Sequence, residues 1–254
     1  MGWFVSLFSR GGIRITRAYL RVPKSPKNHT PSLVNGFGYD SVNDECKVFR
    51  ILENGEKFEA EVFTLGSNSW RLIENLPNVF FFPSLVLRKL YNVFMNDSLH
   101  WLTQKNNDFK IVVFNVGREV VNVFQIPRES KDAIRGFGVL GERLCVIGGS
   151  DFHSDDLIVW VMKEYGVESS WAKECVINRR AVDSRWFGGL EVMQAKNGEL
   201  ILLGEGRNLG YYDIQKKLFT PIEINPGKAD PIRQVQQPIL PVGSLFSPEN
   251  VGRR

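Results

Sequence analysis

Cysteine is scarce in this chain, and its pattern excludes a disulfide framework. The sequence contains three cysteines, an odd number, and Cys46, Cys145 and Cys175 lie far apart with no CxxC pair among them. Such usage is typical of a reducing compartment, where thiols stay free. We therefore expect a cytoplasmic and/or nuclear protein whose cysteines pack as small apolar side chains.

Long apolar runs and an excess of charge of one sign are also missing. No apolar stretch approaches the roughly 20 residues that a membrane-spanning helix needs. The 32 Lys and Arg residues nearly balance the 28 Asp and Glu residues, which leaves a net charge of +4. A surface that binds nucleic acid is usually far more basic than this. We expect neither a membrane nor a nucleic acid as a partner.

Residues that could carry out chemistry are few. The chain has three histidines. His153 lies among the acidic residues of 151–156, but Asp and Ser also dominate solvated turns, and we interpret this stretch as a turn. His100 falls inside an expected strand, where a packed or capping role is more common than a catalytic one. Because no GxSxG nucleophile elbow is present either, we expect no catalytic or metal-binding residue, no cofactor and no enzymatic activity.

What the chain does contain is a weak repeat of about fifty residues. Each copy has an apolar strand, a short polar turn, a large apolar anchor and a second apolar strand. The first strands of the four copies end at Leu65, Val116, Met162 and Ile214, and the anchors are Trp70, Val121, Trp171 and Phe219. We interpret the recurring Trp70 and Trp171 as core residues. A period of this size is typical of radial or stacked β architectures.

Turn signals divide each copy further. Residues 36–40 and 46–51 read as strands on either side of the turn at 41–45, and Asn54-Gly55 is a strong two-residue hairpin signal. A similar hairpin is expected at 136–139 and 144–147, and further inner strands at 99–102 and 200–203. Each copy therefore holds about four strands, which is one propeller blade. We predict an all-β, β-propeller-like fold, incomplete, with about four to five blades of antiparallel strands.

The two ends of the chain differ from the repeat. Residues 1–14 form an atypical start, residues 15–248 the β-propeller-like domain, and residues 249–254 a tail. The part from residue 225 onward carries five prolines and reads mostly as loop, with one short strand at 242–246. Helical periodicity is nearly absent, and residues 85–90 are the one short helical candidate.

Two segments between strands have the composition of a binding surface. Aromatic and arginine residues are enriched at the energetic centres of protein interfaces. The candidates for contact with a partner protein are Phe80, Phe81, Phe82, Arg88 and Lys89 in one segment and Arg179, Arg180, Arg185 and Trp186 in the other. The alternative for the Phe run is a buried strand, or packing beneath its own loop.

Particular strings resemble a known family. Residues 35–48 resemble the GFGYD…DYKV opening of the F-box associated domain of plant F-box proteins. Residues 159–177 are the closest match and resemble that family's string IWVMKEYGVxxSWTKLFTI. Further similarity at 62–70, 96–102 and 111–127, and weaker similarity at 16–23 and 242–248, extends the resemblance over roughly residues 15–248.

The resemblance implies a β-propeller-like domain that recognises a substrate protein. In that family it follows an N-terminal F-box, which docks a Skp-type adaptor in a cullin ubiquitin ligase. We expect an unknown protein substrate as a partner. Residues 1–14 do not resemble an F-box, so we expect the Skp-type adaptor as a further partner only if an F-box exists upstream. A free-standing interaction module or a non-functional remnant is one alternative, and a propeller enzyme such as a glycoside hydrolase, which would need a carboxylate pair, is another.

Overall fold

The computed structural model of the chain consists of β-structure. It describes residues 23–25, 32–54, 57–67, 69–73, 76, 92–105, 108–130, 134–149, 156–178, 182, 190–196, 199–204 and 209–222. The regular structure in these ranges is made of strands β1 to β16 and two single-turn 3-10 helices, Arg128–Ser130 and Glu168–Ser170. None of the helices in the described part is long and apolar enough to span a membrane.

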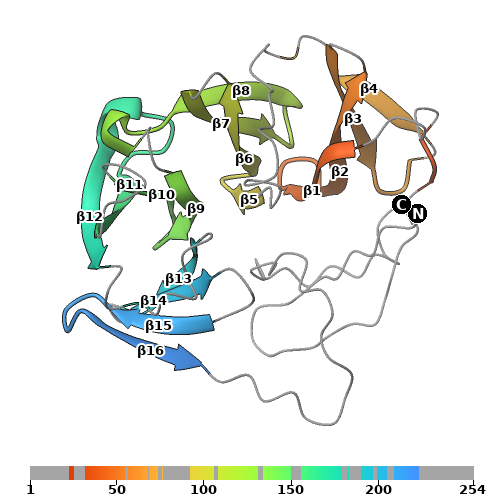
Figure 1. Cartoon of the computed structure of the whole chain (residues 1–254). Helices are drawn as coiled ribbons and strands as arrows, with labels where there is room; N and C mark the ends of the chain where they lie inside the picture. Colours follow the sequence, from red (N-terminus) through yellow and green to blue (C-terminus); the bar gives the residue numbers. More distant parts are fainter. Residues whose placement is uncertain are drawn as a thin grey trace. The chain divides into compact units, whose positions relative to one another are not determined.

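The strands form four sheets of four, and in each sheet the strands are hydrogen-bonded in chain order (Figure 1). We call these sheets blades 1 to 4. Blade 1 contains β1 (Ser32–Asp40), β2 (Glu45–Asn54), β3 (Lys57–Thr64) and β4 (Trp70–Ile73), and blade 2 contains β5 (Asn92–Met95), β6 (Ser98–Lys105), β7 (Asp108–Asn115) and β8 (Val120–Gln125). Blade 3 contains β9 (Ile134–Leu140), β10 (Arg143–Gly148), β11 (Asp156–Met162) and β12 (Trp171–Asn178), and blade 4 contains β13 (Leu190–Lys196), β14 (Glu199–Gly204), β15 (Leu209–Asp213) and β16 (Leu218–Ile222).

This arrangement confirms the predicted repeat. The four aligned apolar residues close or directly follow the third strand of their blade, and each anchor is the first or second residue of the fourth strand. A four-stranded meander is the unit from which β-propellers are built. The predicted all-β, β-propeller-like fold class is therefore correct.

The predicted hairpins are also found. Asp40 pairs with Glu45 across the first turn, and Asn54 pairs with Lys57 where the Asn-Gly signal stands. The hairpin expected near residues 136–147 is β9–β10, and the strands expected at 99–102 and 200–203 lie inside β6 and β14. The atypical start at 1–14, the strand expected near residues 15–22, the helical candidate at 85–90, the strand expected at 242–246 and the tail at 249–254 fall outside the described residues.

The chain divides into two compact units, residues 1–103, 112–123 and 239–254, and residues 104–111 and 124–238. In the first unit, apolar side chains of blades 1 and 2 form a shared core that includes Phe49, Val62 and Phe114. In the second unit, blades 3 and 4 share a core that includes Val159 and Leu202. The three cysteines are free, and two of them are fully buried, as expected of small apolar side chains.

Two glycines in β1 allow blade 1 to approach blade 2 closely. A Cβ atom on Gly36 would lie 2.7 Å from Leu99 Cδ1, and one on Gly38 would lie 2.6 Å from Val116 Cγ2. Both distances are shorter than carbon atoms in contact can adopt. The Gly-Phe-Gly string at 36–38 is therefore explained by packing between blades, because any side chain at either glycine would push the blades apart.

The two recurring tryptophans are not enclosed in the core, which corrects the sequence-based interpretation, although Trp70 packs against a core cluster of blade 1 that includes Phe63. Trp70 and Trp171 each open the fourth strand of their blade and are only partly buried. The indole N–H of Trp171 donates to the carbonyl oxygen of Gln125, the last residue of β8 and part of the same unit, at 2.9 Å. The indole N–H of Trp70 donates in the same way to the carbonyl oxygen of Pro23, also at 2.9 Å. The indole N–H at the ring edge bonds to a backbone carbonyl oxygen, and this role explains why tryptophan recurs at a position that is only partly buried.

We expect Trp171→Phe and Trp70→Phe each to lower the free energy of unfolding by about 1 kcal/mol, the usual net contribution of one hydrogen bond. The phenyl ring keeps part of the packing and removes the indole donor. Denaturant unfolding of the two variants measures the change. A loss above about 3 kcal/mol would instead indicate the emptied-core behaviour expected of a fully buried aromatic residue.

Candidate functional site

The residues predicted to contact a partner lie outside the described residues, and the structure therefore does not test them. These are Phe80, Phe81, Phe82, Arg88, Lys89, Arg179, Arg180, Arg185 and Trp186. Their places in the chain can still be compared through the strands on either side. The first set falls between β4 and β5 and the second between β12 and β13, so both lie in a connection that leaves a fourth strand for the next blade.

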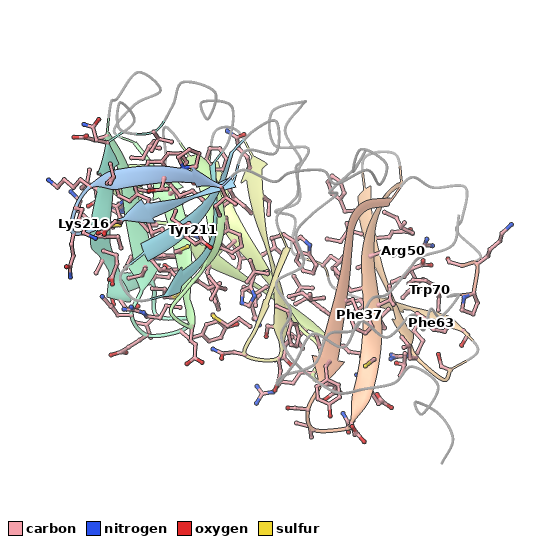
Figure 2. All side chains as sticks on the ribbon, turned by 90° about the horizontal axis from the view of Figure 1, so that it is seen from below. Phe37, Arg50, Phe63, Trp70, Tyr211 and Lys216 are labelled. Atoms are coloured by element: carbon pink, nitrogen blue, oxygen red, sulfur yellow. The ribbon has the colours of Figure 1, made fainter. Side chains whose placement is uncertain are left out.

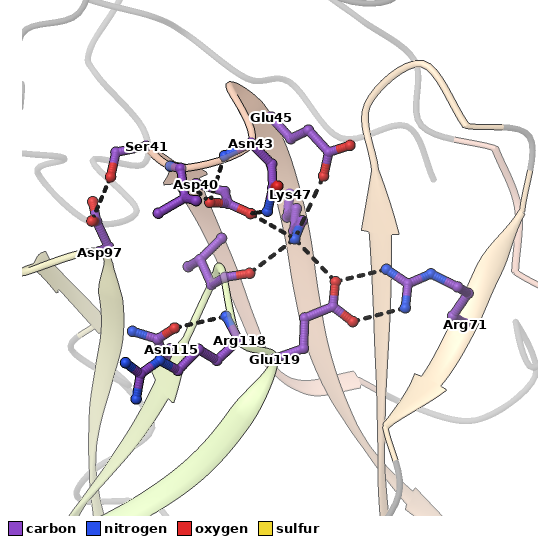
Figure 3. A network of polar contacts seen from close by, with 12 residues as sticks. Asp40, Ser41, Asn43, Glu45, Lys47, Arg71, Asp97, Asn115, Arg118 and Glu119 are labelled. Carbon is purple, nitrogen blue, oxygen red and sulfur yellow. Dashed lines mark hydrogen bonds and ion pairs between the residues drawn. The ribbon is translucent and has the colours of Figure 1, made fainter.

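A network of charged side chains lies where the β1–β2 turn meets the β7–β8 turn (Figure 3). At its centre is Lys47 of β2, whose side chain is 4% exposed. The Lys47 Nζ atom lies 3.0 Å from Asp40 Oδ2 and 3.1 Å from Glu119 Oε1. It also donates to the carbonyl oxygen of Val116 at 3.0 Å. The ammonium group thus bridges blade 1 to blade 2 within the first unit.

Asp40 holds the turn that places Lys47. Its carboxylate accepts hydrogen bonds from the backbone N–H of Val42 at 3.1 Å and of Asn43 at 3.2 Å, and from Asn43 Nδ2 at 2.8 Å. An Asp at the first position of a turn commonly bonds to backbone N–H groups further along in this way. The same turn contacts blade 2 a second time, because the Ser41 hydroxyl donates to Asp97 Oδ2 at 2.6 Å.

Glu119 extends the network to the protein surface. Its two carboxylate oxygens each accept a hydrogen bond of 2.7 Å from the guanidinium of Arg71, a residue of β4. This two-pronged geometry is the strongest form of carboxylate recognition by arginine. The Arg71 side chain is 54% exposed, so solvent weakens this outer pair, whereas the inner pairs with Lys47 are shielded.

The network keeps its members charged at neutral pH. Burial raises the pKa of Asp40, but hydrogen bonds from Asn43 and Lys47 outweigh this and lower the pKa to about 2. Burial acts in the same direction on Glu119, and hydrogen bonds from Arg71 and Lys47 bring its pKa below the usual value. Burial lowers the pKa of Lys47, but the bonds to Asp40 and Glu119 raise it overall. These three groups act as fixed charges rather than as donors and acceptors of protons.

The direction of the carboxyl pKa shifts bears on the alternative that the chain is a glycoside hydrolase. The general acid of such an enzyme needs a raised carboxyl pKa. Within the part of the chain that the structure describes, every carboxyl group whose pKa is displaced has it lowered: Asp40, Glu119, Glu174 and Asp213. None of these four therefore suits the role of general acid.

Sequence reasoning missed this network. The Asp40 turn was identifiable, because Asp is favoured at the first position of a turn. The partners were not, since Arg71 and Glu119 lie 48 residues apart and Lys47 and Val116 lie 69 residues apart. Spacing of this kind carries no pattern that a single sequence reveals.

A second charged cluster is buried on blade 1, where Arg50 and Trp70 lie close together (Figure 2). Arg50 of β2 donates from Nε to Glu61 Oε2 of β3 at 2.7 Å, and both side chains are almost completely buried. The Trp70 ring covers the guanidinium, with its centroid 4.6 Å from Arg50 Cζ. The hydroxyl of Ser25 lies 2.8 Å and 3.0 Å from the two Glu61 oxygens. The buried ion pair is therefore enclosed by an aromatic ring and a serine hydroxyl.

His100 is a packed residue, as its place in a strand predicts. It is fully buried in β6, and its Nδ1 lies 3.0 Å from the carbonyl oxygen of Val93. A carbonyl oxygen only accepts hydrogen bonds, so this contact is a hydrogen bond in the tautomer that carries its proton on Nδ1. Burial lowers the His100 pKa to about 4. Of residues 151–156, only Asp156 is described, and its carboxylate accepts a hydrogen bond from Asn178 Nδ2 at 3.2 Å.

We expect His100 to make the protein less stable in mild acid. Its pKa falls from 6.5 in the unfolded chain to about 4 in the folded chain, so the unfolded chain binds more protons between these values. The contribution of His100 to the free energy of unfolding is then fully present above about pH 6.5. It is lost as the pH falls to 4, and the total loss is about 3 kcal/mol. Denaturant unfolding as a function of pH measures the loss, and His100→Gln should remove it from this window. An unchanged slope in the variant would contradict the assignment.

Four meanders of four strands define a β-propeller type of domain, and comparison with known proteins identifies the family. The model of the F-box associated beta propeller domain family matches residues 16–209, and the chain belongs to this family. It is 29% identical over 213 residues to the F-box protein CPR1 of Arabidopsis thaliana, which covers 74% of this chain and 51% of the relative.

Two further Arabidopsis proteins are similar. The chain is 27% identical over 206 residues to F-box protein At4g22390, covering 73% of this chain and 51% of the relative. It is 27% identical over 149 residues to F-box/kelch-repeat protein At3g23880, covering 54% and 38%. The chain thus spans about half the length of the first two relatives and less of the third.

Proposed function

We propose that this chain is the substrate-recognition domain of an F-box protein and binds a partner protein. The observation that supports the proposal most strongly is the family match over residues 16–209, together with relatives that are F-box proteins. Recognition does not require the domain to carry out chemistry, which fits the fixed charges of the Lys47 network. Docking to a Skp-type adaptor would depend on an F-box in the same protein.

We propose two connections as candidate binding surfaces, each taken by itself: the connection from β4 to β5 and the connection from β12 to β13. Both contain the aromatic and arginine residues that dominate protein interfaces. Both connections leave a fourth strand and lead to the first strand of the next blade. The turn between β15 and β16 follows a third strand instead, and it therefore belongs to a different kind of connection.

Affinity capture from a plant extract, with quantification by mass spectrometry, tests this proposal. The bait is the whole chain as wild type, as an Arg179→Ala/Arg180→Ala/Trp186→Ala variant, and as a Lys216→Ala/Lys217→Ala control in the β15–β16 turn. A protein retained by the wild type and the control but lost from the loop variant is then purified and titrated against all three. We expect the loop variant to weaken binding by about tenfold or more, and the control to have no effect.

Two results would contradict the proposal. Equal affinity of the wild type and the loop variant would show that recognition uses another surface. Failure of every captured protein to bind the purified chain directly would contradict a recognition role. We propose that binding takes place in a reducing compartment, the cytoplasm and/or nucleus, because all three cysteines are free; localisation of a tagged full-length protein tests this.

A further inference from the structure

We propose that Ser25 is a phosphorylation site, and that its modification releases residues Pro23–Ser25 from blade 1. This inference concerns regulation of the domain and does not depend on which protein it binds. It rests on three observations: the contacts of the Ser25 hydroxyl, the charge of its surroundings, and the residues that flank it in the sequence.

Side-chain contacts attach this segment to blade 1. Residues 23–25 belong to none of the described strands. The Ser25 side chain is nevertheless buried, with the residue 4% exposed, and its hydroxyl bonds to the Glu61 carboxylate. Two residues earlier, the Pro23 carbonyl accepts the hydrogen bond from Trp70. A segment attached in this way can detach without unfolding the blade, because no strand pairing has to break.

The sequence around Ser25 suits a proline-directed protein kinase. Ser25 is followed by Pro26 and flanked by Lys24 and Lys27. In the transfer step, Ser25 Oγ attacks the γ-phosphorus of a nucleoside triphosphate bound to the kinase. The new O–P bond forms as the bond from the γ-phosphorus to the β–γ bridging oxygen breaks, the nucleoside diphosphate leaves, and the serine proton passes to the kinase's catalytic carboxylate.

The charge around Ser25 determines the consequence. A phosphoserine carries a charge of about −1.5 to −2, and here it would stand beside the Glu61 carboxylate. Among the described residues, the cation bonded to Glu61 is Arg50, so a phosphate that remained would compete with Glu61 for Arg50 and would leave a carboxylate that is 3% exposed without this partner. Release of the segment avoids this cost, because the phosphate then enters water. Release also frees the Trp70 indole from Pro23.

The first test uses the purified chain, a proline-directed kinase and ATP, with the sites located by mass spectrometry. Three other Ser/Thr-Pro pairs, at Thr30, Thr220 and Ser247, serve as internal references for the rate. Since Ser25 must leave the blade to be modified, Trp70→Phe should speed its phosphorylation by about fivefold, the usual effect of losing one hydrogen bond on such an opening. Trp171→Phe, which removes the equivalent bond in blade 3, should leave the Ser25 rate unchanged. No phosphate on Ser25 in any of these chains, or equal acceleration by both variants, would overturn the proposal.

The second test measures the charge effect directly through stability. Ser25→Asp and Glu61→Gln should each lower the midpoint of denaturant unfolding, the first by repulsion and the second by leaving Arg50 unpaired. The double variant should be more stable than Glu61→Gln alone, because Asp at position 25 then supplies the partner for Arg50. Ser25→Asn controls for side-chain size and should not show this recovery. A double variant less stable than both single variants would overturn the assignment of Glu61 as the group that repels the phosphate.

Discussion

Phe49→Ala should lower the free energy of unfolding by about 3–5 kcal/mol, the usual loss when a large aromatic side chain is removed from a core. Phe49 is completely buried between blades 1 and 2. Its ring stacks on Phe114 with centroids 4.1 Å apart and lies 5.1 Å from the ring of Trp101. Alanine would leave a cavity that is bordered by side chains of both blades. The surrounding side chains can fill such a cavity only in part, which adds to the loss of stability.

Denaturant unfolding followed by circular dichroism measures this loss. Val42→Ala is the matched control, because Val42 lies in the neighbouring β1–β2 turn and is 85% exposed; it should change stability by less than about 0.5 kcal/mol. A loss below about 1 kcal/mol for Phe49→Ala would mean that the two blades do not share a tightly packed core.

The second large effect is expected from Lys47→Met, which should cost about 3–5 kcal/mol. The methionine keeps much of the side-chain volume but removes the cation between Asp40 and Glu119. Asp40 is almost completely buried and keeps its bonds to the β1–β2 turn, so its charge would remain without a counterion. The penalty arises from this uncompensated charge more than from the lost attraction.

The double variant Lys47→Met/Asp40→Asn tests this explanation. It removes the anion together with the cation and should recover a clear part of the loss, whereas two independent effects would simply add. Lys216→Met is the matched control, since Lys216 pairs with Asp213 but is 76% exposed, and such surface pairs contribute little. Equal losses for Lys47→Met and Lys216→Met would contradict the shielding of the first network.

The sequence was informative where structure is decided locally. The Asn54-Gly55 signal located a hairpin because two-residue turns have strict backbone requirements. The ends of the third strands were found because the same local pattern of strand, turn and anchor recurs about every fifty residues. In both cases the signal is a short stretch of neighbouring residues and does not depend on a contact between distant ones.

The sequence was not informative where the determining contact is distant. Trp70 and Trp171 recur as core residues do, yet they are half-buried and donate to carbonyl oxygens 47 and 46 residues away. The charged network at Lys47 likewise joins turns from two blades. The residues predicted to bind a partner remain a prediction, because they lie outside the described residues.

The tryptophan hydrogen bonds have a consequence for the order in which contacts can form as the chain folds. Pro23 is the acceptor for Trp70, and Gln125 is the acceptor for Trp171. The two pairs have almost the same separation in sequence, 47 and 46 residues. Each donor and its acceptor are thus about one repeat apart. Each bond can therefore form only after segments 47 or 46 residues apart have come together, so it is a non-local contact whose formation costs loop-closure entropy. Hairpin pairing within a blade has no such requirement.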